Sequence, residues 1–371
     1  MEFFESYGLI LIILAAGVGF VMAWGIGAND VANAMGTSVG SKALTIKQAI
    51  IIAMIFEFAG AYLAGGEVTS TIRKGIIDST FFIDIPEYLV LGMISSLLAA
   101  GIWLAVASWL GWPVSTTHSI IGAIIGFTAT GVSMDAVAWG KVGGIVGSWV
   151  VTPAISGIIA YLIFMSAHKL IFQTDSPFVY AKRYVPFYMA LAGFVMSLVT
   201  IKKGLKHVGL ELSAVNGYLL AIAIAVALGF VGKWFIGRMK FSGSEDADLQ
   251  AANVEKVFAL LMVVTACCMA FAHGSNDVAN AIGPLAAVVS VVTSGGEINS
   301  SATLAWWILP LGGLGIVAGL ALFGHRVIKT VGLTEASLWE KFGPVEPLER
   351  LVKVASLPSH LEVKIRLSYY S

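Results

Sequence analysis

The sequence predicts an all-α, polytopic helical membrane protein with inverted repeats, broken helices and a re-entrant hairpin. Three observations carry this prediction: an apolar composition, a ten-residue motif that occurs twice, and a hydroxyl-rich helix start that follows a proline. Of the 371 residues, 58% are hydrophobic and 12% are charged, and the mean hydropathy is +0.88. A soluble domain needs more charge on its surface, so the lipid bilayer is the expected solvent and partner.

Long apolar runs are the first of these signals. Most of them reach or approach the roughly 20 residues that a helix needs to cross a hydrocarbon core about 30 Å thick. The runs are residues 9–24, 49–66, 88–110, 142–165, 185–201, 218–235, 257–272 and 304–323. One soluble core could hardly bury all of them. We therefore expect a multi-pass protein of the cell (inner or plasma) membrane, whose first run is a span and no secretory signal, because residues 1–8 carry no Lys or Arg.

Charge and cysteine content exclude several functions. Twenty-two basic and twenty-two acidic residues give a net charge of zero, so no nucleic-acid partner is indicated. Cys267 and Cys268 are adjacent within an apolar run, where small packing residues are expected, and no metal or disulfide framework is visible. The polar stretch 241–255 is predicted to be a solvated loop between two halves.

The second signal is an internal repeat. Residues 27–36 (GANDVANAMG) match residues 274–283 (GSNDVANAIG) at eight of ten positions. The match extends upstream, where residues 22–24 (MAW) face residues 269–271 (MAF) at the same offset. Duplication of a membrane segment explains this better than coincidence.

Each copy of the motif places an aspartate where hydropathy predicts membrane. A carboxylate there is costly without partners, so it is by default a candidate functional site. The flanking glycines allow a helix break, and corresponding broken helices in two halves of a transporter point to a midplane binding site. The spacing puts Asp30 with Asn33, and Asp277 with Asn280, on one helical face. A plain helix cap is the alternative, and two matching copies make it the weaker one.

The third signal is the stretch GWPVSTTHSIIGAIIG, residues 111–126. Pro113 interrupts the preceding helix, and a short apolar segment then begins at Ser115, Thr116 and Thr117, which indicates a hairpin or re-entrant turn. Free amides, the positive end of the helix dipole and three hydroxyls suit an oxyanion. The hydroxyls could instead only cap the helix or bond back to carbonyls.

Three further ionisable residues belong to these segments. Glu57 lies among apolar and small residues in the second run and is an intramembrane carboxylate. His118 could relay a proton, or merely cap or pack, and the sequence favours neither. His273 is more weakly indicated, because Ile26 occupies the matching place in the first copy.

Residues 27–34, 274–284 and 113–118 (PVSTTH) resemble the signatures of the PiT inorganic phosphate transporters, and the resemblance covers roughly residues 7–330. It implies an all-helical transporter with two inverted repeats that carries phosphate with Na⁺ or, in many bacterial members, with H⁺ or as a metal–phosphate complex. No cofactor beyond the coupling ion is implied. Homo-oligomers are possible.

The resemblance also implies roles for the matching residues. Phosphate would be bound by Asn29, Asn33, Ser115, Thr116, Thr117, Asn276 and Asn280. The coupling cation would be served by Asp30, Asp277 and Glu57, with Na⁺ at the two aspartates. Electrostatics agrees, because aspartates would repel phosphate unless a cation lies between them. None of the motifs contains a Lys or Arg that would make a simple basic anion pocket.

We expect four regions. Residues 1–170 form the first transmembrane repeat, 171–253 intervening helices and a polar loop, 254–330 the start of the second repeat, and 331–371 an atypical polar tail. Residues 332–371 carry ten charges in forty, against thirty-four in the first 331 residues. They contain no second Ser-Thr-Thr hairpin motif. We interpret the tail as out of frame, after a truncation or frameshift; a real, soluble tail on a natural short variant is the alternative.

Two alternatives to symport follow from the sequence. An inactive, truncated family member would explain the missing second hairpin motif. An anion channel is a further alternative, but a two-copy site at broken helices favours alternating access. An enzyme is not expected, because no nucleotide loop, metal-ligand cluster or nucleophile triad is visible.

Overall fold

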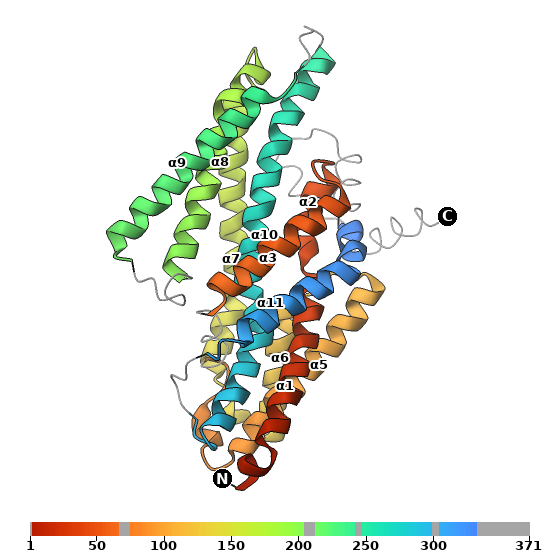
Figure 1. Ribbon diagram of the computed structural model, residues 1–371, viewed down its shortest axis with the longest axis vertical. Coiled ribbons are helices and arrows are strands. Elements are labelled where there is room, and N and C mark those ends of the chain that lie inside the picture. The colour runs from red at the N-terminus through yellow and green to blue at the C-terminus, as the bar shows by residue number, and fades with distance from the viewer. Residues whose placement is uncertain (1, 67–74, 204–211, 242–246, 299–303, 332–371) are drawn as a thin grey trace.

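The computed structural model describes residues 2–66, 75–203, 212–241, 247–298 and 304–331 (Figure 1). Its α-helices are α1 (Glu2–Asn29), α2 (Val31–Gly40), α3 (Ile46–Ala64), α5 (Pro86–Leu110), α6 (Thr116–Gly131), α7 (Trp139–Ala167), α8 (Pro177–Lys203), α9 (Ala214–Arg238), α10 (Ala247–Thr293) and α11 (Ile308–Gly319). Short helical turns are η1 (Ser79–Phe82), η2 (Met134–Ala136), η3 (His168–Phe172) and η4 (Leu320–Gly324). In these described ranges no strand forms, and one β-bridge pairs Ile77 with Val137.

Eight helical segments of the described chain are long and apolar enough to cross a membrane. Each contains most of one predicted apolar run, so the multi-pass prediction is confirmed. Helix α7 shows the membrane solvent most clearly, because Val142 is its one buried residue and Val150 is 73% exposed. Such an apolar exterior is stable in lipid, where hydrocarbon replaces a protein core as the apolar surroundings.

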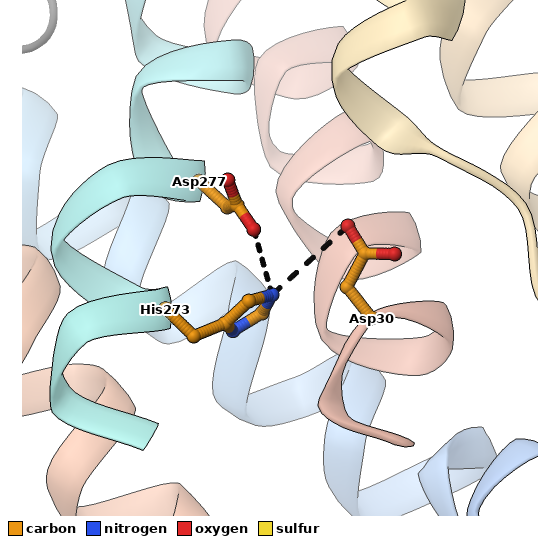
Figure 2. Close-up of side chains that lie close together, drawn as sticks. All are labelled: Asp30, His273 and Asp277. Atoms are coloured by element: carbon orange, nitrogen blue, oxygen red, sulfur yellow. Dashed lines mark ion pairs between the residues drawn. The ribbon is translucent and has the colours of Figure 1, made fainter. Parts of the chain in front are cut away.

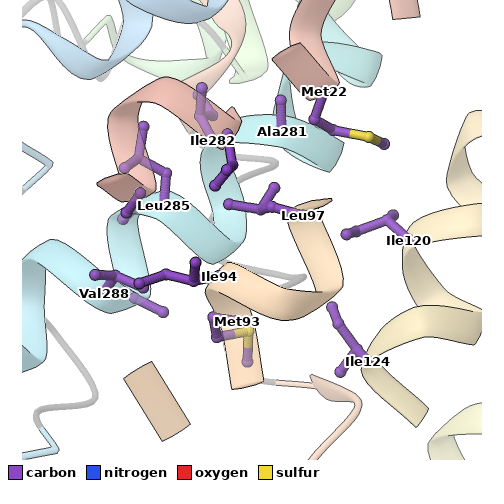
Figure 3. Close-up of a cluster of buried hydrophobic side chains, with 14 of the residues drawn as sticks. Met22, Met93, Ile94, Leu97, Ile120, Ile124, Ala281, Ile282, Leu285 and Val288 are labelled. Carbon is purple, nitrogen blue, oxygen red and sulfur yellow. The ribbon is translucent and has the colours of Figure 1, made fainter. Parts of the chain in front are cut away.

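The helices form two groups joined by α10 (Figure 1). Helices α8 and α9 pack against each other, and α8 packs against the first part of α10. Helices α1, α5, α6 and α11 gather around the second part of α10, and α3 crosses it near the middle. Buried side chains from α1, α5, α6 and α10 form the core there (Figure 3), among them Met22, Leu97, Ile120 and Leu285.

Glycines hold the crossing of α1 and α11 close. A Cβ atom at Gly27 would overlap the carbonyl of Ile316, and one at Gly319 would overlap the carbonyl of Trp24. Small residues let membrane helices approach until their backbones touch, which strengthens packing where lipid gives no hydrophobic drive. This crossing fixes the end of α1 that carries the first Asn-Asp motif.

The crossing of α3 and α10 repeats this arrangement. A Cβ atom at Gly274 would overlap the carbonyl of Glu57, and one at Gly60 would overlap the carbonyl of Phe271. Gly274 and Phe271 are the repeat equivalents of Gly27 and Trp24. Each motif helix therefore packs on the helix that follows the other motif, and the two repeats interlock.

The predicted helix break forms in the first copy of the motif and not in the second. Helix α1 ends at Asn29 and α2 begins at Val31, with Asp30 between them. Helix α10 runs without interruption through Asn276 and Asp277. Ser275 Oγ and Asn276 Nδ2 both donate to the carbonyl of Ala272, so these polar groups are satisfied inside the helix. The prediction of a second break is wrong for this reason.

The polar loop predicted at 241–255 is also shorter than expected, because α10 begins at Ala247. Alanines and the Glu255–Lys256 pair favour helix and extend α10 beyond the apolar run. The predicted tail 331–371 lies outside the described residues, apart from Val331.

Candidate functional site

A tight turn returns the chain from α5 into α6. Gly111 follows α5 with a φ of 71°, a left-handed conformation that glycine adopts without strain. The chain is then extended to Ser115, whose side chain accepts a bond from the amide of His118 and caps α6. Helix α6 has 16 residues, too few to cross a bilayer, and it packs back on α5 as the predicted hairpin.

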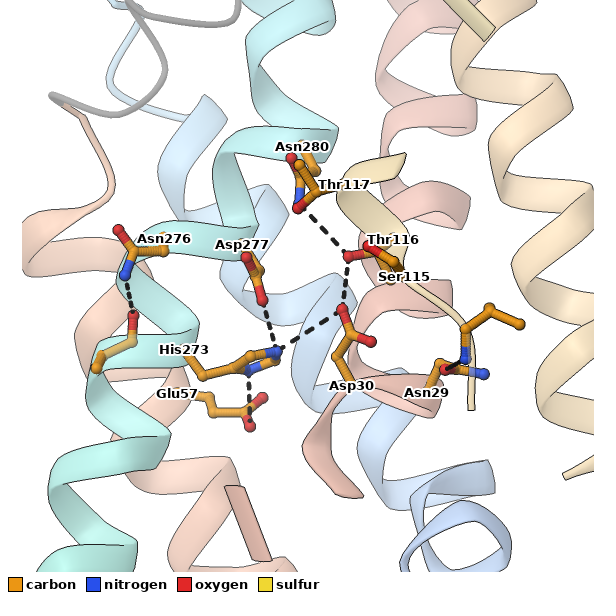
Figure 4. Close-up of polar contacts among 12 residues, drawn as sticks. Asn29, Asp30, Glu57, Ser115, Thr116, Thr117, His273, Asn276, Asp277 and Asn280 are labelled. Carbon is orange, nitrogen blue, oxygen red and sulfur yellow. Dashed lines mark hydrogen bonds and ion pairs between the residues drawn. The ribbon is translucent and has the colours of Figure 1, made fainter. Parts of the chain in front are cut away.

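Asn29 fastens this hairpin to the end of α1. Its Nδ2 donates to the carbonyl of Trp112 at 2.8 Å and lies 3.3 Å from Ser108 Oγ. Its Oδ1 accepts from the amide of Val114 at 2.9 Å (Figure 4). Asn29 is buried, and these bonds engage both the nitrogen and the oxygen of its amide. In this conformation the side chain predicted to bind phosphate holds the hairpin.

The two aspartates of the repeat converge beside α6. Thr116 Oγ1 donates to Asp30 Oδ2 at 2.5 Å. His273 Nε2 lies 2.8 Å from Asp277 Oδ2 and 4.0 Å from Asp30 Oδ2 (Figure 2). Donor atoms of Asp30, His273 and Asp277 fall within 4.8 Å of one another. Carboxylate oxygens around so small a space suit a cation.

Glu57 reaches the cluster from α3 and faces the other side of the imidazole. Its Oε1 lies 3.1 Å from His273 Nδ1, and the side chain has no exposed surface (Figure 4). Among the described residues, neither ring nitrogen and neither Glu57 oxygen has a hydrogen bond of good geometry. The contacts of His273 with Glu57 and Asp277 are therefore close polar approaches at 3.1 and 2.8 Å and not formed hydrogen bonds. In native proteins, buried polar atoms without hydrogen-bond partners indicate a functional site or a bound ion.

Asn280 joins the second repeat to the hydroxyls of the hairpin. Its Nδ2 donates to Thr117 Oγ1 at 2.9 Å and lies 3.4 Å from Thr116 Oγ1. One polar chain therefore runs from α10 through the start of α6 to Asp30 on the first repeat (Figure 4). Among the described residues, no Lys or Arg belongs to this polar network.

Four predicted residues lie apart from this network. Asn33 is exposed, and Asn276 is exposed with its amide bonded to its own helix. Ser115 caps α6, as the structural alternative for the hydroxyls proposes. The ring of His118 lies 3.8 Å from the ring of Trp149, centroid to centroid, so this histidine packs on α7.

His273 is the residue that sequence reasoning undervalued. The comparison with Ile26 counted against it, because the repeat was expected to act symmetrically. Its position four residues before Asp277, on the same helical face, is the signal that could have raised its weight. A histidine in an apolar run beside an intramembrane carboxylate is a candidate partner for that carboxylate.

The repeat supplies a matched test of the hairpin contact. We expect Asn29→Ala to destabilise the protein by about 1–3 kcal/mol, because the buried Asn29 side chain no longer bonds the carbonyl of Trp112 and the amide of Val114. Asn276→Ala should change stability little, because Asn276 is exposed. Thermal unfolding in detergent compares the two, and equal losses would contradict a special role for Asn29.

Several known proteins are similar to this chain in sequence. Residues 26–338 match the model of the phosphate transporter family. A Haemophilus influenzae protein named "Putative phosphate permease" is 56% identical over 332 residues, covering 90% of this chain and 79% of that protein. The chloroplastic inorganic phosphate transporter 2-1 of Arabidopsis thaliana is 39% identical over 342 residues, covering 85% of this chain and 56% of that protein.

A solved structure is also similar. The sodium-dependent phosphate transporter superposes with a TM-score of 0.79 at 38% identity, over 87% of this chain and 78% of that one. Family and solved relative alike are transporters and not enzymes. Because the family model matches residues 26–338, which are most of the protein, this chain belongs to the phosphate transporter family.

Proposed function

We propose that the protein carries inorganic phosphate across the membrane together with Na⁺. The observation that carries the proposal is the convergence of Asp30 and Asp277 on His273, with Asp30 bonded to Thr116 at the start of α6. Two carboxylates repel phosphate. At an effective dielectric of 20, two like unit charges 4 Å apart repel each other by about 4 kcal/mol. A cation between the aspartates removes that repulsion, so that cation and anion bind together.

Phosphate would lie at the start of α6. Thr116 and Thr117 offer hydroxyls there, and the first turn of α6 offers free amides. Asn280 holds both hydroxyls from the opposite repeat. A site made by both repeats suits alternating access, because relative movement of the repeats opens it to one side at a time.

Sodium is preferred to the proton for two reasons. Carboxylate oxygens of Asp30 and Asp277 face a common space beside His273 Nε2, a donor set for a cation. The solved relative at 38% identity is named as sodium-dependent. Proton coupling is the alternative that the experiment must separate.

Uptake by liposomes containing the purified full chain tests the proposal. Labelled phosphate should accumulate with an inward Na⁺ gradient and stay at equilibrium levels when choline replaces Na⁺. Accumulation driven by a pH gradient alone would move the assignment to protons. Phosphate flow without accumulation under either gradient would favour an anion channel. No flow from inserted protein would support an inactive family member.

A prediction about Thr116 tests the phosphate position. Thr116→Val should raise the phosphate concentration for half-maximal uptake about tenfold, since it removes a hydroxyl that contacts both Asp30 and Asn280. Thr116→Ser keeps the hydroxyl and should stay near wild type. Initial uptake rates over a phosphate series give both values, and equal behaviour of the two variants would contradict the role.

A further inference from the structure

The two interlocking crossings carry different residues at equivalent positions. Gly274 packs on the backbone of Glu57 just as Gly27 packs on the backbone of Ile316. The residues before these glycines are His273 and Ile26. The pair His273–Glu57 at the α3–α10 crossing therefore corresponds to the pair Ile26–Ile316 at the α1–α11 crossing.

All of these side chains are buried, so the difference is one of chemistry. His273 and Glu57 are 9% and 0% exposed, while Ile26 and Ile316 are both fully buried. The polar pair costs free energy in the membrane that the apolar pair does not. Retaining it at one crossing, when the fold already packs an apolar version at the other, points to a function beyond packing.

This difference makes the two aspartates unequal. Asp277 is contacted by the imidazole of His273, four residues before it in α10. Ile26 stands four residues before Asp30 and has no polar atom to offer. Asp30 lies farther from the imidazole of His273, at 4.0 Å, and accepts a hydrogen bond from the hydroxyl of Thr116 at 2.5 Å. One aspartate is thus positioned by an imidazole and the other by the hairpin.

The imidazole lies between acceptors. Its Nδ1 faces Glu57 and its Nε2 faces Asp277. A neutral imidazole has one N–H, so it can donate to one of these carboxylates and not to both. With its proton on Nδ1, 3.1 Å from Glu57, the ring is oriented as carboxylates orient the histidines around metals, and the Nε2 lone pair faces Asp277. A cation that contacts both Nε2 and the Asp277 carboxylate makes that second contact favourable.

We propose that His273 is the positioning residue for the coupling cation, that Glu57 acts only by orienting its ring, and that the Ile26–Ile316 crossing takes no part in ion binding. This deepens the proposed function and rests on it for the identity of the ion. The position of Glu57 supports this division of roles. The imidazole of His273 lies between the Glu57 carboxylate and the carboxylates of Asp277 and Asp30 (Figure 4).

Stabilisation of the purified full chain by Na⁺ tests this without transport. A cation that binds the folded protein raises Tm as its concentration rises, and the midpoint of that rise reports affinity. The informative variant is His273→Ile with Glu57→Ile, which copies an arrangement that the fold already packs at the other crossing. We expect its Na⁺ midpoint to rise at least about tenfold. The matched control, Ile26→Val with Ile316→Val, should keep the wild-type midpoint.

A conservative variant separates positioning from packing. Glu57→Gln keeps an oxygen that accepts from His273 and should hold the Na⁺ midpoint within about threefold of wild type. A merely structural role would lower Tm in choline without moving the Na⁺ midpoint. An unchanged midpoint in the His273–Glu57 variant, or an equal rise in the Ile26–Ile316 control, would overturn the inference.

Parallel liposome uptake distinguishes the two proposals. If Na⁺ stabilises the wild-type protein through His273 but the protein carries no phosphate, the symport proposal is contradicted and the ion-site proposal is not. Wild-type protein that shows no stabilisation by Na⁺ would overturn the ion site itself.

Discussion

Asp30→Asn is expected to reduce Na⁺-driven phosphate uptake strongly while the protein still inserts and folds. The substitution keeps the size of the side chain and an oxygen that can accept from Thr116. It removes the negative charge that we assign to the cation. Charged hydrogen bonds and ion contacts are worth about 1.5–3 kcal/mol each, so uptake should fall by about 10- to 100-fold or more. Initial rates in liposomes with and without a Na⁺ gradient measure the loss.

Asp78→Asn is the matched control. Asp78 is exposed between spans, caps η1 and accepts from the amide and hydroxyl of Thr80. These bonds hold the pKa of Asp78 below its ordinary value, so this carboxylate is also ionised near neutral pH. Its loss should leave uptake near wild type. Equal loss in both variants would show a general effect of charge, and persistent uptake in Asp30→Asn would remove Asp30 from the cation site.

Hydropathy and the repeat were sufficient to predict the membrane fold. The spans and the hairpin follow from local signals, because apolar length and the position of a proline act within a few residues of each other. The short helix after Pro113 begins where it was predicted, at Thr116 directly after Ser115. These features needed no knowledge of which helices touch.

Contacts between distant segments could not be predicted in the same way. The sequence gives no distance between Glu57 and His273, which approach because Gly60 and Gly274 let α3 and α10 touch. The role of Asn29 depends on the hairpin that meets it some eighty residues later. The expected break at Asn276 fails because its side chain finds a partner in its own helix.

The repeated motif is used unequally because one described hairpin serves both copies. Asn29 is buried against the hairpin while its equivalent Asn276 is exposed. The relation reverses one turn later, where Asn280 is buried against Thr117 and its equivalent Asn33 is exposed. Burial thus follows contact with the α5–α6 hairpin, and equal sequence gives unequal sites.

Gly27→Ala should cause the largest loss of stability. The added Cβ would overlap the carbonyl of Ile316, which is backbone and cannot change rotamer. Relief requires α1 and α11 to move apart, and this disturbs the helix end that carries Asn29 and Asp30. Overpacking costs about 1–3 kcal/mol, and more where backbone is the obstacle. We expect Tm to fall by about 5–10 °C, measured by thermal unfolding in detergent.

Gly17→Ala in the same helix is the control, because nothing lies within 4 Å of a Cβ at that position. It should leave Tm unchanged or raise it slightly, since alanine favours helix over glycine. Gly274→Ala should match Gly27→Ala, because a Cβ there would overlap the carbonyl of Glu57. If Gly27→Ala and Gly17→Ala unfold at the same temperature, the α1–α11 crossing is looser than described. If Gly27→Ala alone is destabilised, the two crossings are unequal in packing as well as in chemistry.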